Sequence, residues 1–235
     1  MRLHRFYIQA ALQKGQQIAL SDEKLLHQMR SVFRFQPGDT VILFNGDGRD
    51  YVSEIVSLTK SEGVFRVTQM TENAWKPRVK LALAISMIKK DHFEWIVEKA
   101  TELGVSEIIP FVSERSEKKG WNRERAERIM IEACEQSGRS DIPKLGEMMT
   151  LEDFMNTEKR EVAVFHTENR SPIYETEAND SGKEIVALVG PEGGWSDREV
   201  EAFRAKGYVI AKLPTPVLRA ETAAIAIASV ILAGK

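Results

Sequence analysis

The sequence predicts an α/β protein in which a mostly parallel sheet, with helices on both faces, follows a small β-barrel. Residues 1–70 contain short runs of β-branched and aromatic residues that are separated by turn signals. From about residue 75 the pattern changes, and apolar strands alternate with helical segments. This alternation is typical of a parallel sheet that is covered by helices. We therefore expect two domains, residues 1–72 and residues 73–235.

The first domain is expected to hold one helix among its strands. Ser21 is placed to cap this helix, Asp22 and Glu23 would lie in its first turn, and the helix would run to about Val32. Residues 71–77 are polar and would form a linker. The expected strands are Leu3–Ile8, Gln17–Leu20, Thr40–Phe44, Asp50–Ser57 and Gly63–Gln69.

In the second domain, strands and helices are expected to alternate. Gly104 and Gly207 would each end a helix, while Ser196 and Glu199 can form a capping box at the start of another. The expected strands are Val79–Ser86, Glu107–Val112, Glu161–His166, Glu184–Val189 and Tyr208–Leu213. The expected helices are Asp91–Leu103, Trp121–Arg139, a helix from the Ser196 cap to Lys206, and Ala220–Leu232.

Composition and missing motifs narrow the class of function. Cys134 is the single cysteine, so no disulfide can form within the chain, and we expect a cytoplasmic protein with no signal peptide or membrane span. The formal net charge of −2 argues against a protein that binds polyanions over its whole surface, but it is compatible with a local basic surface. The sequence has no P-loop, dinucleotide-binding GxGxxG or nucleophile-elbow motif. It also has no HExxH motif and no Cys/His cluster, so we expect no metal.

Three segments that follow predicted strands point to a single ligand site. The strand Glu184–Val189 breaks into the glycine loop Gly190–Gly194, and a proline-containing turn follows the strand that ends at Leu213. His166 and Thr167 stand at the end of a third strand. Because the carboxyl ends of parallel strands share one edge of a sheet, these segments predict one pocket there.

The glycine loop leaves the chemistry of the ligand open. Gly193 and Gly194 let backbone groups approach a ligand closely, and no second basic anchor points to phosphate. An adenine edge or a ribose would fit equally well. Glu192 is either a ribose ligand or a solvated carboxylate.

Candidate catalytic and RNA-binding residues lie outside the glycine loop. Arg219 precedes an apolar helix, where a cation opposes the helix dipole, so a functional role explains it better than a structural one; Glu221 also has a capping explanation. Cys134 has no basic neighbour in sequence and is interpreted as inert. Basic residues beside aromatic ones are typical of RNA contact, with a solvated barrel surface as the alternative. They are Arg2, Arg5, Arg30 and Arg34 in the first domain, with Lys90 and Arg115 in the second.

Several motifs, in this order, resemble one protein family along essentially the whole chain. They are His27…Arg30-Ser-Val-Phe-Arg34, Lys99-Ala-Thr-Glu-Leu-Gly104, Glu135-Gln136…Arg139, Gly190-Pro-Glu-Gly-Gly194 and Leu218-Arg-Ala-Glu-Thr-Ala223. The last two motifs form a specific pair. The sequence is therefore similar to the bacterial ribosomal small-subunit methyltransferase E family of the SPOUT superfamily.

This resemblance implies a PUA-like RNA-binding barrel followed by a SPOUT α/β domain whose last strands form a trefoil knot. It implies an S-adenosylmethionine-dependent methyltransferase that modifies N3 of one uridine in 16S rRNA near the decoding centre, and a homodimer. Arg219 and Glu221 would be catalytic: Arg219 would stabilise the uracil anion, and Glu221 would act as a base or an orienting group. The cofactor would be bound by His166, Thr167, Gly190, Pro191, Glu192, Gly193, Gly194, Leu213, Val217 and Leu218.

The sequence departs from the family at Pro214 and Pro216, where a glycine and an arginine are usual. Proline cannot take the positive φ that glycine allows and lacks an N–H group, so we expect a cofactor loop of different shape. Two alternative functions stay open at this point: a non-catalytic RNA-binding factor for ribosome assembly, and a SPOUT-type tRNA methyltransferase.

Overall fold

The computed structural model describes residues 3–73, 77–117, 121–167 and 182–233. The chain forms two compact units, each with its own core. Unit 1 contains residues 1–76 and 134–142, and unit 2 contains residues 77–133 and 143–235. Sequence reasoning did not place residues 134–142 with the first unit, because that assignment depends on contacts between distant parts of the chain.

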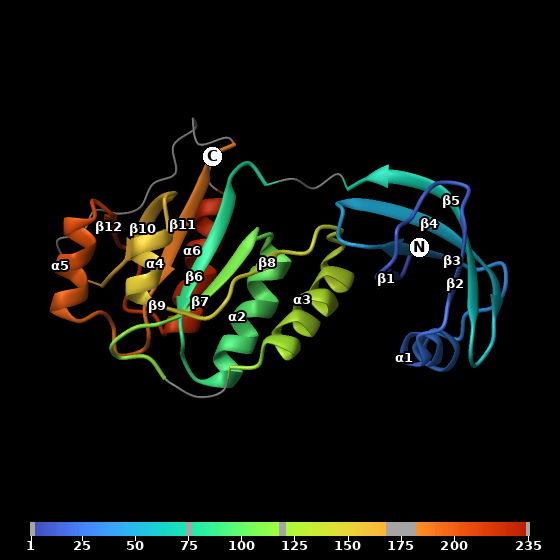
Figure 1. Ribbon diagram of the computed structural model, residues 1–235, viewed down its shortest axis with the longest axis horizontal. Coiled ribbons are helices and arrows are strands. Elements are labelled where there is room, and N and C mark those ends of the chain that lie inside the picture. Colours follow the sequence, from blue (N-terminus) through green and yellow to red (C-terminus); the bar gives the residue numbers. More distant parts are fainter. Residues whose placement is uncertain (1–2, 74–76, 118–120, 168–181, 234–235) are drawn as a thin grey trace. The chain divides into compact units, whose positions relative to one another are not determined.

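Unit 1 is a curled five-stranded sheet in the order β1-β3-β4-β5-β2 (Figure 1). Strands β1 and β3 pair in parallel, and the other pairs are antiparallel. Register shifts in the β4–β5 pair mark irregularities of the kind that bend and twist a sheet. The strands are β1 (Arg5–Tyr7), β2 (Gln17–Leu20), β3 (Thr40–Phe44), β4 (Arg49–Leu58) and β5 (Gly63–Glu72). The predicted strands are confirmed, although β5 extends into the segment expected to be a linker.

The helical segment of unit 1 differs from the prediction in two ways. Asp22, rather than Ser21, caps α1 (Glu23–His27), because its carboxylate accepts hydrogen bonds from the backbone N–H groups of Lys24 and Leu25. The segment then continues as the π-helix η1 (Gln28–Val32). Hydrophobic periodicity in a sequence does not distinguish these two helical forms, so the change could not be predicted.

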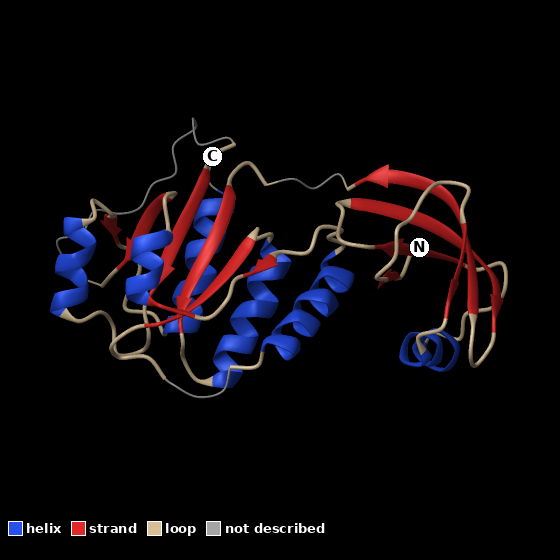
Figure 2. Ribbon diagram, in the orientation of Figure 1, coloured by secondary structure: helices blue, strands red, loops and turns tan. Residues whose placement is uncertain are grey.

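Unit 2 contains a parallel sheet in the order β12-β10-β11-β6-β7-β8, and β9 also pairs with β7 (Figure 2). Every pair in this sheet is parallel, as predicted. The strands are β6 (Lys80–Ser86), β7 (Glu107–Val112), β8 (Lys144–Leu145), β9 (Met149–Thr150), β10 (Glu161–Phe165), β11 (Glu184–Val189) and β12 (Val209–Ala211).

Helices lie on both faces of this sheet (Figure 2). Alternate residues of the central strands form a core with Leu151 and Phe154 of α4 and with Val200 and Phe203 of α5. On the other side, α6 packs against β6 and β11 and also contacts α2. The helices are α2 (Lys90–Leu103), α3 (Arg123–Ser137), α4 (Leu151–Thr157), α5 (Asp197–Ala205) and α6 (Ala220–Ala233), and α3 continues into the segment 134–142 of unit 1.

Helix signals in the sequence of unit 2 correspond to observed caps. Gly104 ends α2 with φ of 97°, in the left-handed region that glycine favours. Ser196 and Glu199 form the expected capping box of α5. The short elements β8, β9 and α4 were not predicted, because they contain too few residues to show a hydrophobic period. The expected trefoil knot stays a prediction.

Candidate cofactor and substrate site

Two adjoining pockets lie at the carboxyl ends of β10, β11 and β12. The smaller has a volume of about 490 Å³ and the larger about 950 Å³. Their walls share seven residues: Phe165, His166, Thr167, Val189, Val217, Leu218 and Ala223. The pockets therefore form one continuous candidate site in unit 2.

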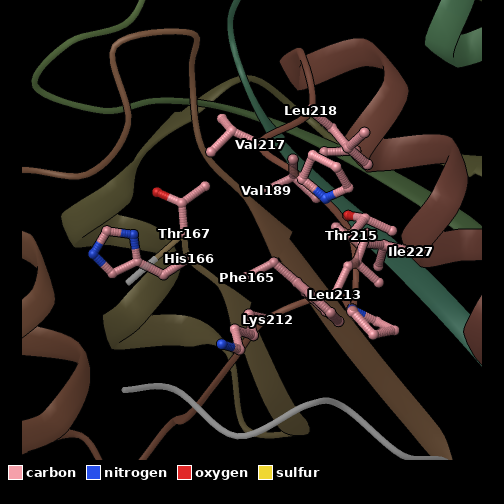
Figure 3. A pocket seen from close by; sticks show the side chains of 13 residues that line it. Phe165, His166, Thr167, Val189, Lys212, Leu213, Thr215, Val217, Leu218 and Ile227 are labelled. Atoms are coloured by element: carbon pink, nitrogen blue, oxygen red, sulfur yellow. The ribbon is translucent and has the colours of Figure 1, made fainter. Parts of the chain in front are cut away.

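The smaller pocket is mostly apolar and is formed by the segment that follows β12. Figure 3 shows Leu213, Val217 and Leu218 around this pocket, together with Phe165 and Val189 from the ends of β10 and β11. Pro214, Thr215 and Pro216 also line it. The prolines that depart from the family pattern thus belong to the pocket wall, in an exposed bend.

The glycine loop forms part of the wall of the larger pocket, and it has little room for side chains. A Cβ atom on Gly190 would lie 2.9 Å from the ring of Trp195, and one on Gly193 would lie 3.2 Å from Arg115. Gly194 has φ of 66°, which favours glycine. Its N–H donates to the carbonyl oxygen of Pro191 at 2.9 Å, which closes a tight turn.

Trp195 and Arg115 hold this loop in place. The indole N–H of Trp195 donates to the carbonyl oxygen of Phe165 at 3.0 Å, and its ring packs in the core of unit 2. The guanidinium of Arg115 donates to the carbonyl oxygens of Gly193 at 2.9 Å and of Trp195 at 3.3 Å. Sequence reasoning placed Arg115 only at an RNA surface, because a contact between side chain and backbone 78 residues apart leaves no local pattern.

A cluster of buried hydroxyls fixes the segment that carries Arg115. The hydroxyl of Ser86 lies 2.7 Å from that of Ser113 and 2.5 Å from that of Ser116. The capping-box residue Glu199 accepts a hydrogen bond from the backbone N–H of Glu114 at 2.9 Å. Side chains from β6 and α5 therefore orient one rim of the larger pocket.

Charged and titratable side chains of both signs line the larger pocket. Arg219 is exposed there and makes no ion pair with another residue that the structure describes. Glu221, in the first turn of α6, lies opposite His92 of α2, with 3.6 Å between Oε2 and Nδ1. Lys89, Arg115, Glu117 and Glu192 complete the charged lining. Sequence reasoning missed His92 because only the packing of α2 against α6 brings it to this wall.

Every residue predicted to bind the cofactor, and both predicted catalytic residues, line one or both pockets. The candidate RNA-binding residues are more scattered. Arg30 is half-buried and Arg34 exposed on unit 1, beside the stacked rings of Phe33 and Phe35. Lys90, exposed at the start of α2, lies 3.8 Å from Glu94. Arg2 lies outside the described residues.

Arg5 does not lie on the surface. Its side chain is 6% exposed, and its guanidinium donates to both carboxylate oxygens of Asp50, at 2.9 and 2.6 Å, and to the hydroxyl of Ser140. The basic and aromatic neighbours in sequence that suggested RNA contact do not decide its position, because Asp50 and Ser140, the latter in the segment 134–142 of unit 1, bind its guanidinium. We therefore leave Arg5 out of the candidate RNA surface.

The described residues contain no group of three or more His, Cys, Asp or Glu side chains that could hold a metal ion. Among the same residues, no helix is long and apolar enough to cross a membrane.

Comparisons with known proteins find a match for each unit. Residues 75–232 match the model of an RNA methyltransferase domain, and residues 21–68 match that of an RNA methyltransferase PUA domain. The ribosomal RNA small subunit methyltransferase E of Rickettsia conorii is 32% identical over 240 residues, which cover 100% of this chain and 97% of that protein. The protein of the same name from Bacillus subtilis is 29% identical, over 94% of this chain and 93% of that protein.

Two solved methyltransferase structures are similar to this chain over nearly its full length. The ribosomal RNA small subunit methyltransferase E from Neisseria gonorrhoeae, bound to S-adenosylmethionine, is 27% identical with a TM-score of 0.87 and covers 97% of this chain and 96% of that one. A putative methyltransferase from Legionella pneumophila, also with bound S-adenosylmethionine, is 29% identical with a TM-score of 0.87 and covers 99% and 98%. The chain thus belongs to the ribosomal RNA small subunit methyltransferase E family.

Proposed function

We propose that this chain transfers a methyl group from S-adenosylmethionine to N3 of one uridine in 16S rRNA, near the decoding centre of the small ribosomal subunit. The proposal rests on the observation that two separate loops line one site. Gly190–Gly194 and the segment from Leu213 to Arg219 are separated in sequence by residues 195–212, which include α5 and β12, yet both line the same pair of adjoining pockets. Membership of the family supports the reaction class.

The pocket suits the cofactor. The apolar side chains of Val189, Leu213 and Leu218 can cover an adenine ring, and the glycine loop offers backbone groups without side-chain interference. Glu192 and Thr167 line the larger pocket and would offer polar groups to a ribose hydroxyl or to the amino-acid part. S-adenosylmethionine carries no phosphate, which agrees with a glycine loop outside the phosphate-binding motifs.

When bound, S-adenosylmethionine supplies a methyl group on a positively charged sulfur. The chain must then help N3 of the uracil lose its proton and must stabilise the negative charge that spreads over O2 and O4. Arg219 is suited to the second task, because its guanidinium is exposed in the larger pocket without a described ion-pair partner. The uridine must leave its base stack to enter this pocket.

Each of the two expected domains would have its own role: residues 1–72 would bind RNA, and residues 73–235 would catalyse the reaction. Arg30 and Arg34 would contact phosphates while the neighbouring rings of Phe33 and Phe35 stack on bases. Lys90 and Arg115 would contact RNA from unit 2. We further propose that the protein acts as a homodimer in the cytoplasm, where ribosomal subunits are found.

The proposal is tested with purified protein, labelled S-adenosylmethionine and small subunits that lack the modification, followed by nucleoside mass spectrometry. The wild-type chain should form 3-methyluridine. Arg219→Ala should lower kcat by a factor of about 10²–10³, the range found when a donor to a developing oxyanion is removed.

The Arg219→Ala protein should keep the wild-type melting curve and its calorimetric affinity for S-adenosylmethionine. Arg198→Ala, which removes an exposed arginine of α5, is the matched control and should remain fully active. Wild-type turnover by Arg219→Ala would remove the role assigned to Arg219. A different methylated nucleoside, or none, from the wild-type protein would contradict the proposed function itself.

A further inference from the structure

Two buried polar atoms face each other on the wall of the larger pocket. Nδ1 of His92 lies 3.6 Å from Oε2 of Glu221. Both atoms are shielded from solvent, and neither has a hydrogen-bond partner among the described residues. Buried polar atoms of this kind are rare in folded proteins and require an explanation. A hydrogen bond between the two, after a small inward movement, would satisfy both.

The surrounding elements hold this pair and expose the other side of the imidazole. His92 lies on α2 and Glu221 in the first turn of α6, and these helices pack against each other. The side chain of Glu221 is 14% exposed and that of His92 is 39% exposed. His92 lines the larger pocket, and because its Nδ1 is buried, the exposure of this side chain belongs to its other atoms.

We propose that His92 is the base that accepts the N3 proton of the target uridine, and that Glu221 is its positioning residue. The Glu221 carboxylate accepts a hydrogen bond from Nδ1–H of His92. The lone pair of the neutral imidazole is therefore on Nε2, at the pocket. The same division of roles between imidazole and carboxylate recurs in unrelated enzymes. The inference rests on the proposed function, and it changes the role of Glu221 from candidate base to orienting group.

The step balances without any further reactant. The N3–H bond of uracil breaks and its proton goes to Nε2 of His92. The electron pair left on N3 attacks the methyl carbon, so an N3–C bond forms as the S–C bond breaks and its electron pair stays on sulfur. S-adenosylhomocysteine and 3-methyluridine result, and the imidazolium, stabilised by the Glu221 carboxylate, returns its proton to water.

The pH dependence follows from the need for a neutral imidazole. Activity should fall as the pH is lowered, since a protonated imidazole cannot accept a proton. The other charged or titratable groups that line this pocket are Lys89, Arg115, Glu117, His166, Glu192 and Arg219, and of these His166 is the other imidazole, so the acidic limb is assigned by its loss in His92→Gln. None of the three cations among them can act as a base while charged, and Glu117 and Glu192 are exposed.

The first test needs neither cofactor nor RNA. Long-range nitrogen–proton NMR of the free protein, at a pH where the imidazoles are neutral, reports which ring nitrogen carries the proton. The chain has four histidines, and the signal lost in His92→Gln assigns His92. The proposal requires the Nδ1–H tautomer in the wild-type protein and loss of that preference in Glu221→Gln. An Nε2–H tautomer in the wild type would overturn it.

The second test is the pH profile of kcat. His92→Gln should lower kcat by about 100-fold, within the range for general acid–base catalysis, and should abolish the acidic limb of the profile. The KM for S-adenosylmethionine should stay within about twofold, since the cofactor loops do not include His92. Glu201→Gln, at an exposed position of α5, is the control for loss of a carboxylate.

The outcomes separate this inference from the function on which it rests. If the wild-type protein forms 3-methyluridine and His92→Gln retains wild-type kcat with the same acidic limb, the base is not His92 and the proposed function stands. If the wild-type protein forms no 3-methyluridine, the proposed function fails, whatever tautomer NMR reports.

Discussion

Arg5 illustrates how the environment of a side chain decides its role. In sequence it stands beside aromatic residues, a pattern that favours RNA contact, but in the structure it is paired with Asp50 inside unit 1. Arg5→Ala should lower the free energy of unfolding by about 3 kcal/mol, because it leaves a largely buried carboxylate without its partner. Urea denaturation measures this change. A loss below about 0.5 kcal/mol, as is usual for surface substitutions, would contradict the assigned structural role.

The same pair makes the stability of the protein depend on pH. Burial alone would raise the pKa of Asp50, but hydrogen bonds from Arg5 and Ser140 outweigh it and hold the pKa below its ordinary value. A carboxylate with a lowered pKa in the folded state stabilises the fold above its unfolded pKa, and this contribution is lost as the pH falls through the folded value. The difference between wild type and Arg5→Ala should therefore shrink in acid.

Cys134 should be inert in the native protein. The thiol is buried, and desolvation raises its pKa to about 12, so almost none of it is thiolate near neutral pH. Iodoacetamide at pH 8 should leave Cys134 unmodified in the native protein and alkylate it rapidly in urea, as mass spectrometry would detect. Rapid alkylation under native conditions would show that residues 134–142 open readily.

At the scale of elements, the glycine loop depends on the absence of a side chain at Gly190. A Cβ atom there would lie 2.9 Å from the Trp195 ring, which is fixed in the core. Gly190→Ala should therefore cost about 1–3 kcal/mol of stability or displace the loop and weaken cofactor binding. Thermal melts and calorimetry with S-adenosylmethionine measure the two effects.

Gly146→Ala is the matched control for Gly190→Ala, because a Cβ atom at Gly146 would meet its nearest neighbour at an ordinary contact distance of 3.4 Å. It should change neither the melting temperature nor the affinity for S-adenosylmethionine appreciably. If Gly190→Ala behaves like this control, the close packing of the loop on Trp195 has no functional consequence.

The longer elements and the location of the site could be predicted from sequence patterns. The strands Thr40–Phe44 and Glu184–Val189 were predicted to the residue, because buried strands and their turn signals are local features. The three loops that follow strands were expected to lie together because the carboxyl ends of parallel strands share one edge of a sheet. Both inferences need only the chain order and the hydrophobic pattern.

The rest of the site could not be predicted, because it depends on contacts between distant residues. The hydrogen bonds from Arg115 to the glycine loop span 78 and 80 residues. The His92–Glu221 pair requires two helices to pack face to face. The helix cap was wrong by one residue, at Asp22 rather than Ser21. Both side chains can cap a helix, and the backbone conformation decides between them.

At the scale of the whole molecule, the single chain exposes apolar side chains at the candidate site and on α6. Val217 is 79% exposed, and Val230 of α6 is 38% exposed. Burial of these side chains against a second copy of the chain would favour association. We therefore expect sedimentation equilibrium to show a homodimer with twice the chain mass of 26.6 kDa.

Val230→Glu should shift this equilibrium toward the monomer, because a buried unpaired carboxylate opposes association. Val209→Glu, at a comparably exposed residue of β12, should leave the mass unchanged. A wild-type protein that stays monomeric at micromolar concentration would contradict the proposed homodimer.

The central claim is that this chain modifies one uridine of 16S rRNA, and modification mapping tests it most directly. RNA is isolated from a strain in which the encoding gene is deleted and from the same strain with the gene restored, and the nucleosides of rRNA and tRNA are analysed by mass spectrometry. We predict that 3-methyluridine disappears from 16S rRNA on deletion and returns with the wild-type gene but not with Arg219→Ala. Loss of a methylated nucleoside from tRNA, with 16S rRNA unchanged, would contradict the claim.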